Sequence, residues 1–120
     1  MSGAVRRSIV VPSHPADVWG ALTDPERLRA WFGAGVELDA RSGGEVRAVW
    51  PDGARSVGSV ELADEAARLV FRWRRIDGVG FGSRVGAATR VSFELEPVED
   101  GTTVSVTEEP VELASVVETP

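Results

Sequence analysis

Few side chains of this chain are suited to covalent chemistry. The one histidine, His14, lies between Ser13 and Pro15, and a lone histidine without cysteine makes no usual metal site. The serines lack the G-x-S-x-G turn of an exposed nucleophile, and the glycine-rich stretches lack the spacing and the lysine of a phosphate loop. The neighbouring acids Glu108 and Glu109 would point to opposite faces of a strand. The sequence therefore predicts no catalytic set, no metal site and no cofactor, and it favours a binding protein over an enzyme.

The aromatic side chains are the remaining candidates for a site. The chain has four Trp and four Phe, most of them on the expected inner faces of strands and helices. They could simply fill a core, or a subset could line an apolar cavity in which a few polar groups orient a ligand. Arg75 shares a strand face with Trp73 and could pair with an acidic or oxygen-rich ligand group. The predicted ligand-binding residues are Trp31, Trp50, Phe71, Trp73, Arg75, Phe81 and Phe93.

Two short helices in the segment 17–32 must position part of this set. Val18, Trp19 and Leu22 form one apolar stripe of about two helical turns. The sequence Thr-Asp-Pro-Glu at 23–26 then restarts the chain, either as a capping box from Thr23 or as an N-cap at Asp24 followed by proline. Helices this short cannot stand alone, so they must pack on another surface.

That surface is a predicted antiparallel sheet. Apolar and polar residues alternate along several segments, for example Leu69, Phe71 and Trp73 against Arg72 and Arg74. A sheet with one apolar and one polar face is antiparallel and covered on one side. The glycine-rich segment 76–88 is predicted to be a long loop and the least ordered interior stretch. Strands are predicted at residues 5–11, 36–40, 45–50, 55–62, 69–75, 89–96 and 103–107.

The order of these motifs resembles the START-like, or SRPBCC, superfamily. The motifs are V-W-x-x-L-T-D-P-E-x-L-x-x-W-F, G-S-V-E-L, L-V-F-R-W, T-R-V-S-F-E-L-E-P and G-T-T-V-S-V-T-E. Within the superfamily the chain is most similar to the bacterial heat-shock-protein ATPase activator homologues, the AHSA-type subfamily, over about residues 5–109. The resemblance implies an α+β helix-grip fold: about seven curved antiparallel strands, two short helices after the first strand, and a C-terminal helix. It also implies an apolar cavity for lipids, polyketides or similar molecules.

The sequence departs from this family at the C-terminal helix. That helix usually has about five turns, whereas only residues 110–120 remain here, about 16 Å if helical. We therefore expect a short or truncated helix at 110–120 in a single domain spanning 1–120. The apolar sheet face would then need another cover, because large exposed apolar patches are rare on monomers. A homodimer is one hypothesis.

Composition argues against some classes of partner and some locations. Residues 94–120 hold eight acids and no base, which argues against nucleic-acid binding by that end. The longest apolar runs are too short for a membrane span, and the N-terminus lacks the apolar region of a secretory signal. The chain has no cysteine, so a cytoplasmic location is expected.

Three functional classes follow from the residues and the resemblance together. The first is a carrier or sensor that sequesters a small hydrophobic molecule, and the missing catalytic set favours it. The second is an enzyme of the polyketide cyclase or aromatase kind, which an inward His, Tyr, Asp or Glu would favour. The third is a protein-interaction module that contacts a chaperone, by analogy with the eukaryotic activator domain.

Overall fold

One curved antiparallel sheet and two short helices make up the part of the chain that the structure describes. This computed structural model describes residues 4–78 and 84–111, without the side chains of Trp31 and Arg84. The elements are β1 (Val5–Val11), α1 (Pro15–Leu22), α2 (Pro25–Phe32), β2 (Gly35–Leu38), β3 (Glu45–Val49), β4 (Arg55–Asp64), β5 (Arg68–Asp77), β6 (Arg84–Val98) and β7 (Gly101–Pro110).

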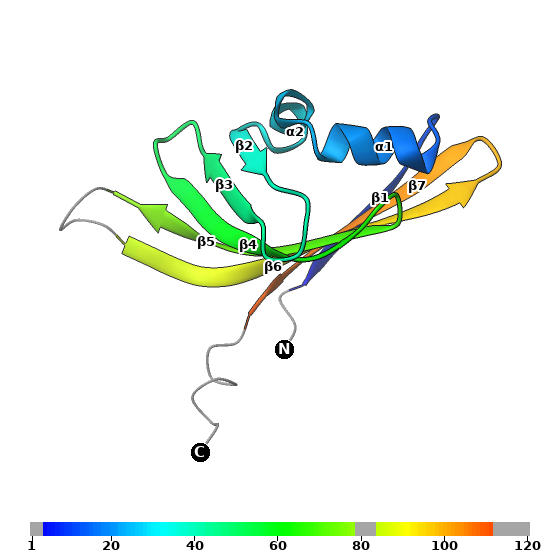
Figure 1. Cartoon of the computed structure of the whole chain (residues 1–120). Coiled ribbons are helices and arrows are strands. Elements are labelled where there is room, and N and C mark those ends of the chain that lie inside the picture. Colours follow the sequence, from blue (N-terminus) through cyan, green and yellow to red (C-terminus); the bar gives the residue numbers. More distant parts are fainter. Residues whose placement is uncertain (1–3, 79–83, 112–120) are drawn as a thin grey trace, which may run out of the picture.

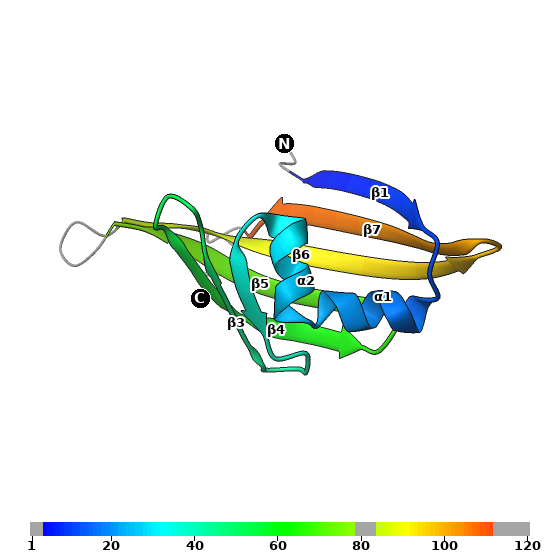
Figure 2. The ribbon, with the colours of Figure 1, turned by 90° about the horizontal axis from the view of Figure 1, so that it is seen from above.

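The seven strands lie in the order β1-β7-β6-β5-β4-β3-β2. Strands β2 to β7 form a meander of sequence neighbours, and β1 pairs with β7 at the far edge. Figure 1 shows both helices over the concave face of the sheet, and Figure 2 shows from above that α2 crosses the strands whereas α1 runs nearly along them. The predicted α+β helix-grip arrangement, with about seven strands and two short helices after the first, is confirmed.

Local sequence explains why the two helices begin and end where they do. Each helix starts with a proline at its first position, and Asp24 caps α2 by accepting a hydrogen bond from the Glu26 N–H at 3.1 Å. Of the two alternatives for this turn, the structure has the Asp24 cap. The Thr23 hydroxyl instead donates to the carbonyl of Trp19, 3.0 Å away. Gly33 ends α2 in the left-handed conformation, with φ of 66°.

The core lies between the helices and the concave face. Val18 and Leu22 of α1 and Leu28 of α2 are buried against inward side chains of the strands. The inward strand residues follow the alternation that the sequence predicts. They include Val46, Ala48, Val60, Leu69, Phe71, Trp73, Val91, Phe93, Leu95 and Val104.

Two sequence expectations need correction. The segment 76–88 is not a loop throughout, because β5 continues to Asp77 and β6 begins at Arg84. Ladder hydrogen bonds hold these outer strand ends despite the glycines, and a register shift between Arg74 and Ile76 accommodates the change. Pro110 ends β7 rather than starting a helix. The expected disorder around residues 79–83 and the short helix expected over 112–120 lie outside the described residues.

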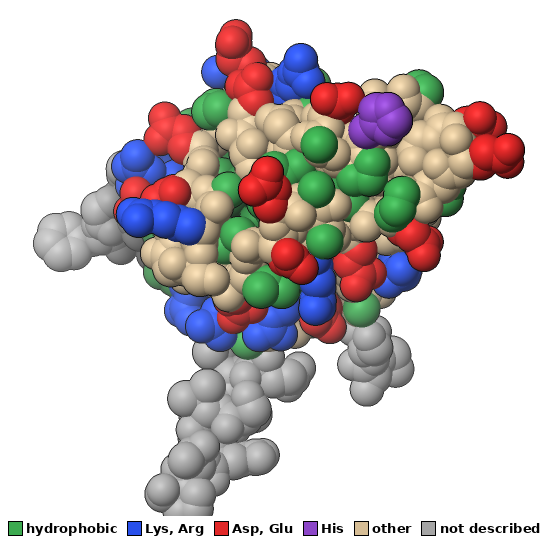
Figure 3. Space-filling model, turned by 45° about the vertical axis from the view of Figure 1, so that its right-hand side comes forward, with side chains coloured by type: hydrophobic (Ala, Val, Ile, Leu, Met, Phe, Trp, Pro, Cys, Tyr) green, Lys and Arg blue, Asp and Glu red, His purple; other side chains and the backbone are tan. Residues whose placement is uncertain are grey.

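Other features bear on the functional classes. His14 is exposed at the start of α1, where its side chain makes no capping hydrogen bond (purple in Figure 3). Neither described helix is long and apolar enough to cross a membrane. Within residues 4–78 and 84–111, no group of three or more His, Asp or Glu side chains is placed to hold a metal ion.

Candidate ligand-binding site

A continuous set of aromatic rings occupies the concave face. Trp73 lies at its centre, with ring centroids of Phe71, Trp50 and Phe32 at 4.9, 5.8 and 5.6 Å. Phe93 extends the set, with its ring 6.2 Å from that of Phe32. Most of these pairs meet edge to face, the geometry that the ring quadrupoles favour. The set therefore connects β5, β6 and the residue after β3 with α2.

Strand register explains how so many rings fit. Gly58 of β4 lies directly opposite Trp73 of β5. A Cβ atom at position 58 would collide with the backbone of Arg72 and Trp73, so only glycine fits this close approach. Phe71, Trp73 and Phe93 are 2%, 6% and 1% exposed. These three rings therefore serve as core, and any ligand meets mainly the rings at the edge of the set.

At one end of the ring set, the polar groups satisfy each other. The guanidinium of Arg75 pairs with the carboxylates of Asp52 and Asp77 and lies 5.9 Å from the ring centre of Trp50. The Trp50 indole N–H donates to the Ser56 hydroxyl at 2.8 Å. The Asp77 hydrogen bond is the main cause that raises the pKa of Arg75. The backbone N–H of Ala54, then Arg75, lower the pKa of Asp52. This end is closed by its own ion pairs.

The opposite end of the ring set is open. A hollow of about 210 Å³ lies between α2 and the β1–β7 edge of the sheet. Phe32 and Phe93 are its aromatic walls, and Ile9 is 51% exposed beside them. No ion pair to another described residue involves Arg7 or Glu108, the two charged residues of the hollow. The lining residues are Arg7, Ile9, Phe32, Phe93, Val106 and Glu108.

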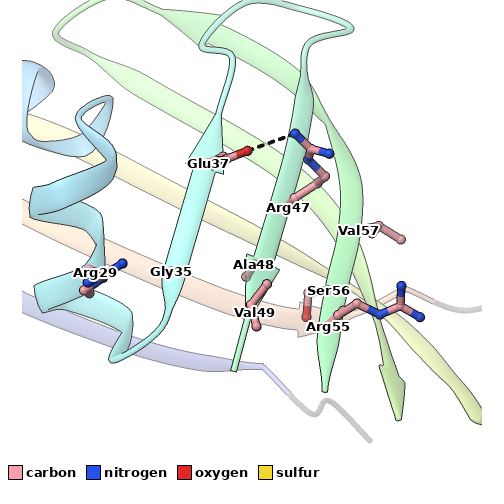
Figure 4. A pocket seen from close by; sticks show the side chains of 9 residues that line it. All are labelled: Arg29, Gly35, Glu37, Arg47, Ala48, Val49, Arg55, Ser56 and Val57. Carbon is pink, nitrogen blue, oxygen red and sulfur yellow. Dashed lines mark hydrogen bonds and ion pairs between the residues drawn. The ribbon is translucent and has the colours of Figure 1, made fainter. Parts of the chain in front are cut away.

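A larger depression, of about 550 Å³, lies over the outer face of β2, β3 and β4 (Figure 4). Its walls carry no aromatic ring, and an ion pair of 2.9 Å joins Arg47 to Glu37 across it. Such a charged and open surface suits solvent better than an apolar ligand. The lining residues are Arg29, Gly35, Glu37, Arg47, Ala48, Val49, Arg55, Ser56 and Val57.

The structure brings most of the predicted site residues together. Trp50, Phe71, Trp73, Arg75 and Phe93 share the concave face, but Phe93 alone also lines the hollow. The side chain of Trp31 and the whole of Phe81 lie outside the described residues.

Sequence reasoning missed the other residues of the hollow, although signals for two of them existed. Phe32 belongs to the apolar stripe that the sequence gives the second helix, four residues after Leu28. Val106 alternates with Val104 on one face of β7, and Thr103, Ser105 and Thr107 on the other face are polar. Both residues of this strand face could therefore have been assigned to the apolar side of the sheet.

Solved structures with the same architecture support the fold. DynU16, a protein of the dynemicin biosynthetic locus, is 28% identical with a TM-score of 0.70, and the match covers 96% of this chain. This chain spans only 40% of the length of DynU16. A protein from Rhodobacter sphaeroides is 27% identical with a TM-score of 0.71, covering 98% of this chain and 83% of that one. A protein from Rhizobium loti is 24% identical with a TM-score of 0.72, covering 98% and 88%.

The sequence itself also matches a family. None of the curated proteins matches it significantly. Residues 12–119, however, match the family described as "Activator of Hsp90 ATPase homolog 1-like protein". This match includes both helices, all strands from β2 to β7 and the aromatic residues of the concave face. In agreement with the SRPBCC resemblance of its motifs, the chain belongs to the activator of Hsp90 ATPase homolog 1-like family.

Proposed function

We propose that this protein binds a small hydrophobic molecule in the hollow between α2 and the β1–β7 edge. The observation that carries the proposal is the apolar wall there: Phe32, Phe93 and Val106 line the hollow, and Ile9 remains half exposed beside them. When a ligand covers exposed apolar surface, the free energy falls by about 25 cal/mol for each Å² removed from water. The polar ends of Arg7 and Glu108 would orient the molecule.

The size of the hollow limits the ligand. Its volume of about 210 Å³ is below the roughly 300–1,000 Å³ of common ligand pockets. The ligand is therefore one of few rings, or a larger molecule of which these walls hold one part. The rings of Phe71 and Trp73 lie behind this contact surface and keep Phe32 and Phe93 in place.

The role predicted for Arg75 applies only to a larger ligand that extends from the hollow to the opposite end of the ring set, where Arg75 lies beside Trp50. An acidic group of a ligand would have to replace Asp52 or Asp77 at the guanidinium. Replacing Arg75 with Ala should then weaken ligand binding. An unchanged affinity in this variant would remove Arg75 from the site.

Glu108 favours a second candidate function, turnover of the bound molecule. It is a carboxylate at the edge of an apolar hollow, where it could act as a general base on a polyketide-like substrate. The likeness to a protein of the dynemicin biosynthetic locus supports a ligand of this kind. Chaperone contact, homodimerisation and a cytoplasmic location remain predictions. A chaperone pull-down that retains no ATPase would count against the first, and a concentration-independent monomer mass against the second.

Native mass spectrometry of gently purified protein tests the binding proposal. We expect an adduct that leaves on denaturation and whose mass identifies the ligand. The variant Ile9→Asp places a carboxylate on the apolar wall and should lose the adduct. Val10→Asp is the matched control, because Val10 is 64% exposed on the opposite face of the same strand, and this variant should keep it. Equal adduct occupancy in both variants would contradict the proposed site.

A further inference from the structure

The arginines of the concave face differ in what they contact. Arg75 already has two carboxylate partners, at Asp52 and Asp77. Arg7 lines the hollow at the other end of the face and forms no ion pair with any described residue. From this contrast we infer that the hollow selects hydroxylated aromatic carboxylic acids, with Arg7 pairing the carboxylate and Glu108 accepting the hydroxyl. The inference rests on the proposed function and names its ligand class.

Alternation along β1 separates Arg7 from its neighbour. Arg6 points to the convex face, where it lies 3.6 Å from Glu94. Arg7 points to the concave face, opposite Val106 of β7 in the strand register. Its immediate surroundings in the hollow are apolar, apart from Glu108. A guanidinium pairs with a carboxylate through two parallel, charge-assisted hydrogen bonds, which are stronger than bonds between neutral groups.

Glu108 restricts the ligand further. In the register of β1 and β7, Glu108 is opposite Val5, so Arg7 and Glu108 are diagonal neighbours, about 7–8 Å apart. They form no ion pair with each other. A purely anionic ligand would be repelled by Glu108, whereas a ligand hydroxyl would donate a hydrogen bond to it. A flat ring system with a carboxylate at one end and a hydroxyl at the other matches both groups, while the ring of Phe32 contacts its face or edge.

Isothermal titration calorimetry of the whole chain with three probes tests this selection. The probes are 6-hydroxy-2-naphthoate, 2-naphthoate and its neutral isostere 2-naphthamide. We expect 2-naphthoate to bind about fivefold to tenfold more tightly than 2-naphthamide, as for a charge-assisted hydrogen bond in a partly exposed site. We expect 6-hydroxy-2-naphthoate to bind about threefold to fivefold more tightly again.

Variants assign these preferences to the two residues. Arg7→Met should abolish the preference for 2-naphthoate over 2-naphthamide and leave the affinity for 2-naphthamide within about twofold. Arg6→Met, on the opposite face of the same strand, is the control and should keep the preference. Glu108→Gln should reduce the gain from the hydroxyl. Thermal unfolding checks that every variant is folded.

The possible failures are distinguishable. Equal affinities for 2-naphthoate and 2-naphthamide, unaffected by Arg7→Met, would overturn this inference and leave hydrophobic binding in the hollow intact. A preference that Arg6→Met removes and Arg7→Met keeps would also overturn it. If none of the three probes binds, the inference is wrong. The adduct search with Ile9→Asp and Val10→Asp then decides separately whether the hollow binds any apolar molecule.

Discussion

The two faces of the sheet are built from the same strands but differ in every other respect. The concave face holds the aromatic ring set and most of the buried core. The convex face holds alternating Arg and Glu, as in the pairs of Glu94 with Arg6 and Arg68. Acidic and basic side chains also lie next to one another along the lower edge of Figure 3. The alternation of side chains along each strand, with its period of two residues, therefore separates a face that stabilises the fold from a face that contacts water.

The energies of the two faces should differ as clearly as their composition. A buried aromatic ring contributes several kcal/mol of transfer and packing free energy. An ion pair between half-exposed side chains contributes about 0–1 kcal/mol. The fold therefore depends mainly on the concave side, and the convex ion pairs add little to its stability. Three pairs of variants test this contrast, each taken from one strand or one face.

Truncation of Phe71 should have the largest effect. Phe71→Ala leaves a cavity beside Trp73, and we expect it to lower the free energy of unfolding by about 3–5 kcal/mol. Arg72→Ala, next to it on the convex face, should cost less than about 1 kcal/mol. Urea denaturation followed by Trp fluorescence measures both. If both variants lost a similar amount of unfolding free energy, the proposed energetic difference between the two faces would be wrong.

A buried hydroxyl should have an intermediate effect. Thr102 of β7 is fully buried, and its hydroxyl donates to the carbonyl of Ser13 at 2.6 Å. Thr102→Val leaves that carbonyl without this donor and should cost about 1–3 kcal/mol. Thr103→Val, one residue on and on the other face, should change stability by less than about 0.5 kcal/mol. The urea midpoints of the two variants compare their stabilities, provided that the free energy of unfolding falls with urea at the same slope in both. A larger loss for Thr103→Val would contradict the role of the hydroxyl.

The smallest effect should come from the convex ion pairs. Glu61 contacts Arg90 at 2.7 Å and Arg72 at 3.7 Å. The Arg90 hydrogen bond is the main cause that lowers the pKa of Glu61. The stabilisation is therefore present above the pKa of the unfolded state and is lost as pH falls through the lower pKa of the folded state. Glu61→Gln should cost less than about 1 kcal/mol near neutral pH.

Melting curves between neutral and acidic pH measure this difference. The gap between the natural protein and Glu61→Gln should close toward acidic pH and also shrink at high salt. Glu96→Gln is the control, because the structure gives Glu96 no ion pair with another described residue. A gap that persists at acidic pH would show that Glu61 stabilises through packing rather than charge.

The sequence predicts the fold well because the fold depends on local patterns. The turn from Thr23 to Glu26, the glycine after Phe32 and the alternation from Leu69 to Trp73 each determine an element within a few residues. The superfamily resemblance supplies the arrangement of these elements. The loop predicted for the glycine-rich segment 76–88 is wrong at both ends of that segment. Pairing between β5 and β6 holds these ends as strands, although glycines locally disfavour a strand.

The candidate site is less predictable because distant segments build it. Arg75 is visible in the sequence as an inward cation, but its partner Asp52 lies 23 residues away in a loop. Arg7 and Arg6 look equivalent in the sequence. Their difference arises from which face of β1 meets the hollow and from the position of Glu94 on β6. Such relations depend on register, which residue types alone do not specify.

The pairing of β1 with β7 also has a kinetic consequence. It joins Val5 to Glu108 and Val11 to Thr102, whereas each of the other strand pairs links neighbours along the sequence. Closing so long a segment is entropically slow, so we expect the meander of β2 to β7 to form first and β1 to dock last. Substitutions on β1 would then accelerate unfolding more than they slow folding. Because β1 carries Arg7 and Ile9, the hollow would be the last part of the molecule to be completed and the first to open.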